Sequence, residues 1–250
     1  MDTRLKSATV QAVIILLFLL VWQLLRSWNI VNHLFLAAPS ELLTRSAFAA
    51  FPGYLHYFGT TVNEILIAYA IAAVIGILGG FLLSRSNYVY KVLEPFIVWG
   101  YAIPKIALFP VFLKLFGLGS TTVIVYGAIT GLFVILINTV TGVREVDSHL
   151  LTVSTSLGIK GTKRYTKVIF PSVVPAIFSG LRQAVIQVVL GVLVAELVLN
   201  TIGVGDLIDT LSYSFNVVDL YFVVATVALV MIFVNLALLN VESRLSFWRR

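Results

Sequence analysis

The sequence predicts an all-α membrane protein with six transmembrane helices. Of its 250 residues, 60% are hydrophobic and 11% are charged, and the mean hydropathy is +1.03. A soluble domain of this size could not hide so much apolar surface, because a folded surface must be largely polar. The apolar residues form six runs, each near the roughly 20 residues that cross a bilayer. The runs are apolar on all sides, which excludes half-exposed amphipathic helices, and a β-barrel would alternate instead.

The first run is expected to span the membrane at about 8–27. A short basic prefix precedes it, as in a signal peptide. However, the uncharged stretch from Ser7 to Leu25 is too long for a typical signal-peptide core, and no small-x-small cleavage site follows it closely. We therefore interpret this run as a retained transmembrane helix.

Five further spans are expected at about 60–83, 92–114, 119–143, 173–199 and 219–241. The third contains three prolines, Pro95, Pro104 and Pro110. Charged residues interrupt the third and fifth spans: Lys105, Lys114, Arg182 and Glu196. Such charges usually face a protein interior or a water-filled cavity rather than lipid.

Two connections on the outer side, 28–58 and 200–218, are too short to be separate domains. In the first, Ser40 is expected to cap a short helix at the membrane interface. We divide the chain into a first helix with its external segment (1–57), a five-span transmembrane domain (58–242) and a basic tail (243–250).

The basic residues predict the orientation of these spans. With the N-terminus in the cytoplasm, the inner segments hold twelve of the seventeen Lys and Arg residues, and the outer segments hold only Arg26 and Arg45. The twelve are Arg4, Lys6, Arg85, Lys91, Arg144, Lys160, Lys163, Arg164, Lys167, Arg244, Arg249 and Arg250. The asymmetry places both termini in the cytoplasm, and it explains the net charge of +6 without a nucleic-acid partner.

The longest cytoplasmic loop, 144–172, contains a predicted helix–glycine–helix elbow. Asp147 or Ser148 can cap the first helix. Gly158 can end it, because helices often end at a residue in the left-handed backbone conformation, which glycine adopts at the lowest energy. One face of this helix holds Leu150, Val153, Ser154 and Leu157. Gly161 and Thr162 begin a second, basic helix that leads to Pro171. An ordinary basic loop is the alternative interpretation of the same residues.

The loop also resembles a motif of ABC-transporter permeases, the EAA loop. That motif is an acidic-Ala-Ala triplet, a glycine four residues beyond it, and an Ile-x-Leu-Pro ending. Here Gly158 is followed by Val-Ile-Phe-Pro at 168–171, but the triplet positions are Thr152, Val153 and Ser154. The resemblance continues through AIPKIALFPVFLKLFGLGS, PSVVPAIFSGLRQA and VAELVLNTIGVGDLI. Over about 58–242, the chain resembles the permease subunits of nitrate/sulfonate/taurine-type ABC importers.

This resemblance implies the type I importer transmembrane fold, a prokaryotic cell-membrane location and several partners. These are cytoplasmic ABC ATPase subunits, a second permease subunit in a homodimer, and an external solute-binding protein. ATP hydrolysis is expected in the partner, and no cofactor is expected in this chain. In the family the elbow is the coupling helix, which docks in a groove of the ATPase. The residues assigned to it are Asp147, Leu150, Leu151, Ser154, Leu157, Gly158, Lys160, Gly161 and Pro171.

Six polar residues in or near the spans are candidates for a substrate pathway: Glu64, Lys105, Arg182, Gln183, Gln187 and Glu196. In that role, Lys105 and Arg182 would favour an anionic or strongly polar solute. Alternatively, Glu64 or Glu196 neutralises these two bases, and all are structural. Arg182 and Glu196 are about 21 Å apart along an ideal helix, so they cannot pair within one helix.

Two pairs of glycines at i,i+4 spacing are expected to let helices approach closely, either within the chain or between subunits. They are Gly76 with Gly80 and Gly127 with Gly131.

Motifs of other functions are absent from the sequence. No G-x-x-x-x-G-K-[ST] phosphate loop, H-E-x-x-H metal pair or G-x-S-x-G nucleophile elbow occurs. The absence of cysteine excludes disulfides and thiolate metal sites.

A self-sufficient secondary transporter or channel is the alternative function, but it predicts internal repeats or a coupling-ion site, and no convincing repeat is seen. The sequence leaves the solute open among nitrate, bicarbonate-like anions, sulfonates and small heterocyclic vitamin precursors.

Overall fold

The computed structural model describes residues 2–44 and 53–245. Throughout these two ranges the regular structure is helical, with no strand. Five helices are long and apolar enough to cross a membrane, or six if a bent pair counts as one span. The predicted all-α membrane fold is therefore confirmed. Arg45, Arg249 and Arg250, which contributed to the predicted orientation, lie outside the described residues.

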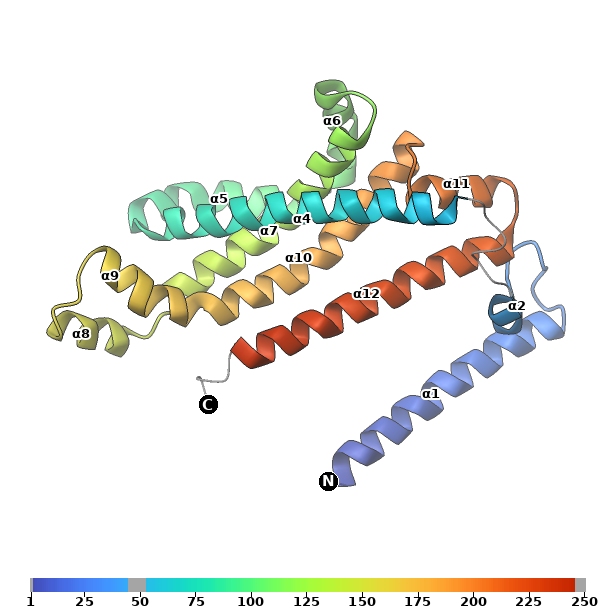
Figure 1. Ribbon diagram of the computed structural model, residues 1–250, viewed down its shortest axis with the longest axis horizontal. Coiled ribbons are helices and arrows are strands. Elements are labelled where there is room, and N and C mark those ends of the chain that lie inside the picture. Colours follow the sequence, from blue (N-terminus) through green and yellow to red (C-terminus); the bar gives the residue numbers. More distant parts are fainter. Residues whose placement is uncertain (1, 45–52, 246–250) are drawn as a thin grey trace.

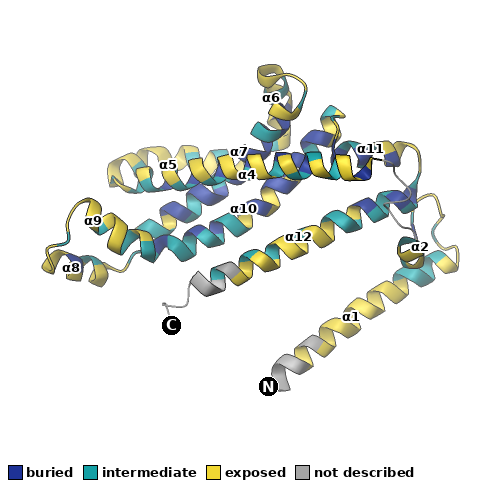
Figure 2. Ribbon diagram, in the orientation of Figure 1, coloured by how far each residue is buried: buried dark blue, intermediate teal, exposed yellow. Residues whose placement is uncertain are grey.

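Three long helices form the core: α4 (Tyr54–Ser84), α7 (Ser120–Arg144) and α10 (Phe170–Leu199). The central helix is α7, which packs against both of the others. The most apolar window of α7 is 61% buried, compared with 22% for α4. Figure 2 shows the buried residues concentrated along α7 and α10.

Small residues allow these three helices to approach closely. The four glycines of the i,i+4 pairs all lie at contacts within the chain: Gly76 against Ile135, Gly80 against Thr139, Gly127 against Val192, and Gly131 against Val188. A Cβ atom at Gly80 would lie 2.5 Å from Cβ of Thr139, which no real contact allows. Because of these glycines, van der Waals packing between backbones holds the core together.

The third predicted span is broken, which corrects the expected helix at 92–114. It consists of α5 (Asn87–Ala102), a 3₁₀ turn η1 (Lys105–Leu108) and α6 (Phe109–Phe116), with a bend of 91° between the two parts. The break falls at Pro104, because the residue before a proline is driven out of the helical conformation. Ile103 accordingly has ψ of 129°. In Figure 1, α6 points away from the other helices.

Two helices lie at the periphery, α1 (Asp2–Ser27) and α12 (Val217–Leu245). Their most apolar windows are 0% and 6% buried, which leaves these surfaces for lipid or for another chain. The two helices meet near one end, where the rings of Trp22 and Tyr221 have centroids 5.9 Å apart. Trp22 also donates a hydrogen bond from Nε1 to the carbonyl oxygen of Ala37, at 2.9 Å.

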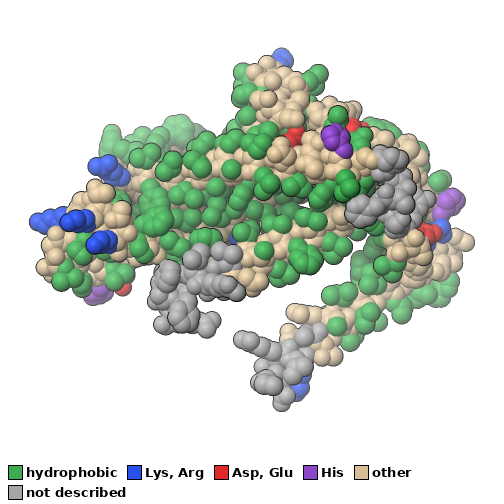
Figure 3. Space-filling model, in the orientation of Figure 1, with side chains coloured by type: hydrophobic (Ala, Val, Ile, Leu, Met, Phe, Trp, Pro, Cys, Tyr) green, Lys and Arg blue, Asp and Glu red, His purple; other side chains and the backbone are tan. Residues whose placement is uncertain are grey.

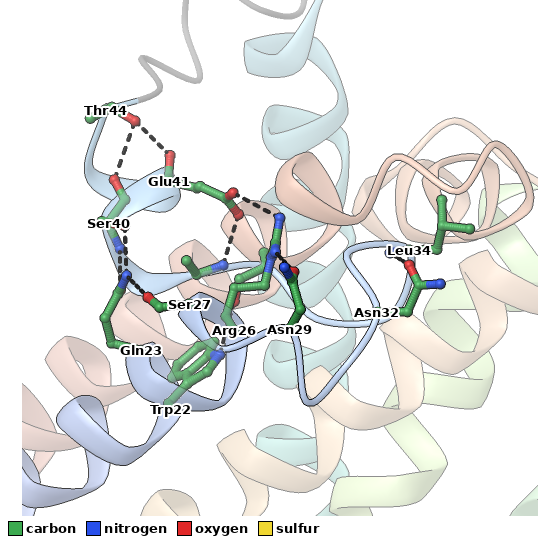
Figure 4. Close-up of polar contacts among 12 residues, drawn as sticks. Trp22, Gln23, Arg26, Ser27, Asn29, Asn32, Leu34, Ser40, Glu41 and Thr44 are labelled. Atoms are coloured by element: carbon green, nitrogen blue, oxygen red, sulfur yellow. Dashed lines mark hydrogen bonds and ion pairs between the residues drawn. The ribbon is translucent and has the colours of Figure 1, made fainter.

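The short helix expected in the first outer connection is present as α2 (Pro39–Thr44). Ser40, however, lies inside it and does not cap it. The carboxylate of Glu41 instead accepts a hydrogen bond from the backbone N–H of Ala38 at 2.8 Å. Ser40 Oγ accepts from Nε2 of Gln23 in α1 at 3.2 Å, so this residue fastens α2 to α1 (Figure 4).

The molecule has two distinct ends, visible in Figure 1. At one end, α2 and α11 (Val204–Tyr213) lie near the start of α4 and the start of α12. At the other end lie α8 (Ser148–Ser156), α9 (Thr162–Arg164) and a π-helical turn η2 (Tyr165–Ile169). Figure 3 shows Lys and Arg side chains gathered at this second end.

Candidate functional site

The predicted elbow between the fourth and fifth spans is formed by α8, a glycine turn and α9. Asp147 precedes α8, and its Oδ1 accepts a hydrogen bond from the backbone N–H of His149 at 2.8 Å. After α8, Gly158 has a φ of +71°. A Cβ atom there would meet nothing within 4 Å. Glycine at 158 is therefore required by the left-handed backbone and not by crowding within the chain.

The second arm of the elbow is continuous with a core helix. The helical segment Thr162–Leu199 runs for 38 residues without a break and includes α9, η2 and α10. Pro171 comes two residues after the π-helical turn η2, and its missing N–H removes one hydrogen bond from this helix without ending it. A displacement of the elbow can therefore be transmitted along α10 into the core.

The first arm leaves apolar side chains exposed at an open cavity beside α10. Ser154 is buried and faces the chain, whereas Leu150, Val153 and Leu157 are 48%, 55% and 71% exposed. Between α8 and the start of α10 lies a cavity of about 510 Å³, lined by five of the predicted elbow residues: Asp147, Leu150, Ser154, Leu157 and Pro171. The other four, Leu151, Gly158, Lys160 and Gly161, do not line it.

The six polar candidates of the spans separate into three groups. The first group is the pair Glu64 in α4 and Glu196 in α10, whose side chains are neighbours. The two residues are 1% and 0% exposed. In the described residues no ion pair joins either carboxyl group to Lys105 or Arg182, so the alternative that these carboxylates neutralise the two bases is corrected.

Hydrogen bonds from two elements, α4 and α11, hold the carboxyl group of Glu196. Oε1 of Glu196 accepts from the hydroxyl of Thr61 in α4 at 2.7 Å. Its Oε2 accepts from the backbone N–H of Gly205 in α11 at 2.8 Å. The Thr61 hydroxyl in turn accepts from the backbone N–H of Val204 at 2.7 Å. The start of α11 is therefore fastened to both α4 and α10.

Two glycines make room for the Glu196 side chain. A Cβ atom at Gly203 would overlap the carboxyl group of Glu196, and one at Gly205 would lie 2.6 Å from its Cβ. Both glycines lie in a stretch that resembles the family, but the sequence assigned them no role, and Thr61 was not among the candidates. Thr61 stands one helical turn before Glu64, and this spacing is the only sign of the cluster that the sequence carries.

The second group consists of Lys105 and Gln187, which line an open cavity of about 290 Å³ together with Tyr126 and Thr130. Lys105 is half-buried, and its Nζ donates a hydrogen bond to the carbonyl oxygen of Tyr101 at 3.0 Å. The Thr130 hydroxyl lies 2.6 Å from the carbonyl oxygen of Gly127 in its own helix and 2.8 Å from that of Gln187, so α7 and α10 are in polar contact at the cavity wall.

The third group is Arg182 with Gln183, further toward the elbow on α10. Nε of Arg182 lies 3.1 Å from Oε2 of Glu242 in α12. This partner was not identified from the sequence, because Glu242 stands sixty residues further along the chain. Gln183 is exposed and donates to the hydroxyl of Ser179 in the same helix at 3.3 Å.

Known proteins share this arrangement of helices and its sequence. The family described as "Binding-protein-dependent transport system inner membrane component" matches residues 72–246, which is more than half of the chain. The chain belongs to this family. It is a permease subunit of an ABC importer with several membrane-spanning helices, as the sequence predicted.

Two relatives of this chain have the same sequence identity to it. The nitrate import permease protein NrtB of Synechocystis sp. is 28% identical over 78% of this chain and 73% of its own length. The putative aliphatic sulfonates transport permease protein SsuC of Bacillus subtilis is 28% identical over 75% of this chain and 68% of its own length.

The fold of this family member also matches a solved structure. A chain of the MetNI methionine ABC transporter in an inward-facing conformation has a TM-score of 0.68 and 16% identity, over 76% of this chain and 95% of that one. The match confirms the predicted importer transmembrane fold.

Proposed function

We infer that this permease forms half of a translocation pathway and that a separate ATPase drives it through the elbow at 144–172. The observation that carries this proposal is the continuity of Thr162–Leu199. One end of this helix belongs to the elbow, and its middle carries Gln187 in the wall of the Lys105 cavity. A partner that moves the elbow would therefore move the cavity wall.

The exposed leucines and valine of α8 fit an ATPase groove by burial of apolar surface. Fully burying one such side chain is favourable by about 1.5–3 kcal/mol. Ser154 is the buried residue of α8, and it occupies a position where the family motif has alanine. We propose that this loop docks without the acidic residue of the motif, because its apolar contacts and the stiff second arm are both retained.

The Lys105 cavity supports assignment of the pathway. A half-buried ammonium and an exposed amide at membrane depth are costly against lipid. We propose that water and a second copy of this chain face them, so that a homodimer encloses the complete pathway. A positive wall favours a small anionic or strongly polar solute, and nitrate and sulfonates are the solutes that name the two relatives.

We propose that the elbow and both termini lie in the cytoplasm, and that α2 and α11 face a solute-binding protein outside. In this arrangement 58–242 forms the transmembrane domain, 1–57 adds a helix at its edge, and 243–250 is a cytoplasmic tail. The basic residues around α9 support the orientation.

Reconstitution tests this function. The chain, the ATPase that co-purifies with it and the solute-binding protein encoded beside it are placed in proteoliposomes, and uptake of labelled nitrate or of an alkanesulfonate is measured. We expect uptake to require ATP on the elbow side and the binding protein on the other. Uptake by the permease alone, driven by an ion gradient, would instead establish the secondary-transporter alternative.

A further inference from the structure

Two buried carboxyl groups, those of Glu64 and Glu196, have no role in the coupling or pathway described above. They lie side by side at the end of the core where α11 begins. In the described part of the chain no ion pair reaches either of them. Two ionised carboxylates in contact and away from water repel each other strongly, so such a pair retains one proton.

The hydrogen bonds assign the negative charge to Glu196. Thr61 has a single hydroxyl proton, and its oxygen already accepts from the N–H of Val204. Its proton is directed to Glu196, because Oε1 lies at 2.7 Å and the alternative acceptor, the carbonyl oxygen of Tyr57, lies at 3.2 Å. Gly205 donates to the other oxygen. Both oxygens of Glu196 therefore receive hydrogen bonds, and this stabilises the ionised form.

Glu64 has the opposite environment. Both of its oxygens are buried, and neither has a hydrogen-bond partner of ordinary geometry within the described residues. The polar side chains that act on it are those of Glu196 and of Ser120 in α7, whose hydroxyl is the single donor group of the two. Glu64 is therefore poorer in donors than Glu196, and a carboxylate with so few donors is costly to bury, whereas a carboxylic acid can donate its own proton to Glu196.

We propose that Glu64 and Glu196 form a proton-binding site, with the proton on Glu64 and the negative charge on Glu196, and that this site fastens α11 to the core. The charge lies at the N-terminus of α11, a ten-residue helix whose backbone dipole favours an anion there. Loss of the proton leaves two adjacent charges, whose repulsion moves the Glu196 carboxylate away from the donors that hold α11. Protonation of Glu64 therefore controls whether the start of α11 stays docked.

Within residues 2–44 and 53–245, no base forms an ion pair that would offset the second charge. Ser120 comes from α7, Thr61 from α4, and the N–H of Gly205 from α11. The charged group that acts on Glu196 is Glu64. On the α12 side, α11 is packed through apolar residues, among them Val223.

Single-cysteine labelling of α11 tests the site, because the chain has no native cysteine. Val204 is 0% exposed and Tyr213 is 79% exposed, so Val204→Cys reports release of α11, and Tyr213→Cys gives the labelling rate of an open position. The full chain is labelled with maleimide in unsealed membranes. The labelling ratio is the rate at Val204→Cys divided by the rate at Tyr213→Cys. Because maleimide reacts with the thiolate, whose fraction rises with pH at both positions, dividing the rates corrects for this rise.

We expect the ratio to be low in the wild-type background and to rise as the pH is raised. Glu64→Gln keeps the donor and cannot lose a proton, so its ratio should stay low at every pH. Glu196→Gln places an N–H₂ group against Thr61 or Gly205, and its ratio should be about tenfold higher at every pH. The asymmetry between these two isosteric variants is the diagnostic result.

Three further results bear on the proposal. Burial and the charge of Asp209 raise the pKa of Asp206, which also lies on α11, so a pH response lost in Asp206→Asn would overturn it. A high labelling ratio in Glu64→Gln, or a labelling ratio that falls when sodium is added, would overturn the proposal. Either result would indicate that the two carboxyl groups bind a metal cation and not a proton. If Glu196→Gln does not reach the membrane, the pH response of the wild type and its absence in Glu64→Gln still decide the question.

Discussion

Nε of Arg182 lies 3.1 Å from Oε2 of Glu242, and this ion pair joins the core helix α10 to the peripheral helix α12. The two side chains are 31% and 24% exposed, so the pair is shielded in part from solvent. The arginine that was a pathway candidate from the sequence therefore has an anionic partner within the chain.

We expect Arg182→Met and Glu242→Met each to lower the stability of the permease by about 1–3 kcal/mol, the cost of leaving the remaining polar group partly buried without its partner. The double variant should recover much of this loss, because neither charge is then left unpaired. Thermal unfolding in detergent measures all four proteins. If the single losses simply add in the double variant, the two residues do not stabilise one another. If Arg182→Met is stable but alters the affinity for solute, Arg182 belongs to the pathway.

The elbow provides a second prediction. Gly158→Val forces a β-branched residue into a left-handed conformation, at a cost of about 1–2 kcal/mol. We expect normal membrane levels but weakened association with the ATPase and loss of uptake. The control is Gly117→Val: Gly117 also has a positive φ, +76°, and a Cβ atom there would meet nothing within 4 Å, but it precedes α7 whereas the elbow follows that helix. Equal loss of ATPase association in both variants would show that general strain, and not the elbow, is responsible.

The features predicted correctly depend on local sequence. The spans follow from runs of apolar residues, and the left-handed turn at Gly158 follows from a glycine placed after a short amphipathic helix. The position of the break in the third span could not be deduced, because three prolines stand there. Pro95 lies within α5 and Pro110 in the first turn of α6, whereas the chain turns at Pro104.

The features that were missed depend on contacts between distant parts of the chain. Thr61 and Glu196 are 135 positions apart, and no periodicity of one helix indicates which residue of another it will face. The same is true of Arg182 and Glu242. Charges in apolar spans could be recognised as partnered or functional, but the choice of partner depends on the way in which α4, α10 and α12 pack.

The Lys105 cavity gives a third prediction. Lys105→Met removes the positive charge from the cavity wall, and we expect uptake of an anionic solute to fall about tenfold or more, the effect of losing about 1.4 kcal/mol of interaction. Lys114→Met is the control, since Lys114 is exposed on α6 and does not line the cavity. Uptake kinetics in proteoliposomes and the protein level are measured together. Unchanged kinetics in a stable Lys105→Met protein would remove Lys105 from the pathway.

The glycine contacts of the core give a fourth prediction. At Gly131 a Cβ atom would lie 2.5 Å from Cγ2 of Val188, so Gly131→Ala should destabilise the permease by about 1–3 kcal/mol through overpacking. Gly59→Ala, in the same kind of helical position but with nothing within 4 Å, should be neutral or slightly stabilising. Thermal unfolding in detergent compares the two. Similar stability of both variants would mean that α7 and α10 are less closely packed than these contacts require.

The last prediction concerns orientation, on which the assignment of ATPase and binding-protein faces depends. Leu43 in α2 is 88% exposed and Tyr88 at the start of α5 is 78% exposed, and the two lie at opposite ends of α4. Each is replaced by cysteine in the otherwise cysteine-free chain, and intact cells are treated with a membrane-impermeant maleimide. Because the inner segments carry most of the basic residues, we expect Leu43→Cys to be labelled and Tyr88→Cys to react only after the cells are opened. The reverse pattern would place the elbow outside, where it could not meet an ATPase, and labelling of both in intact cells would mean that the chain inserts in two orientations.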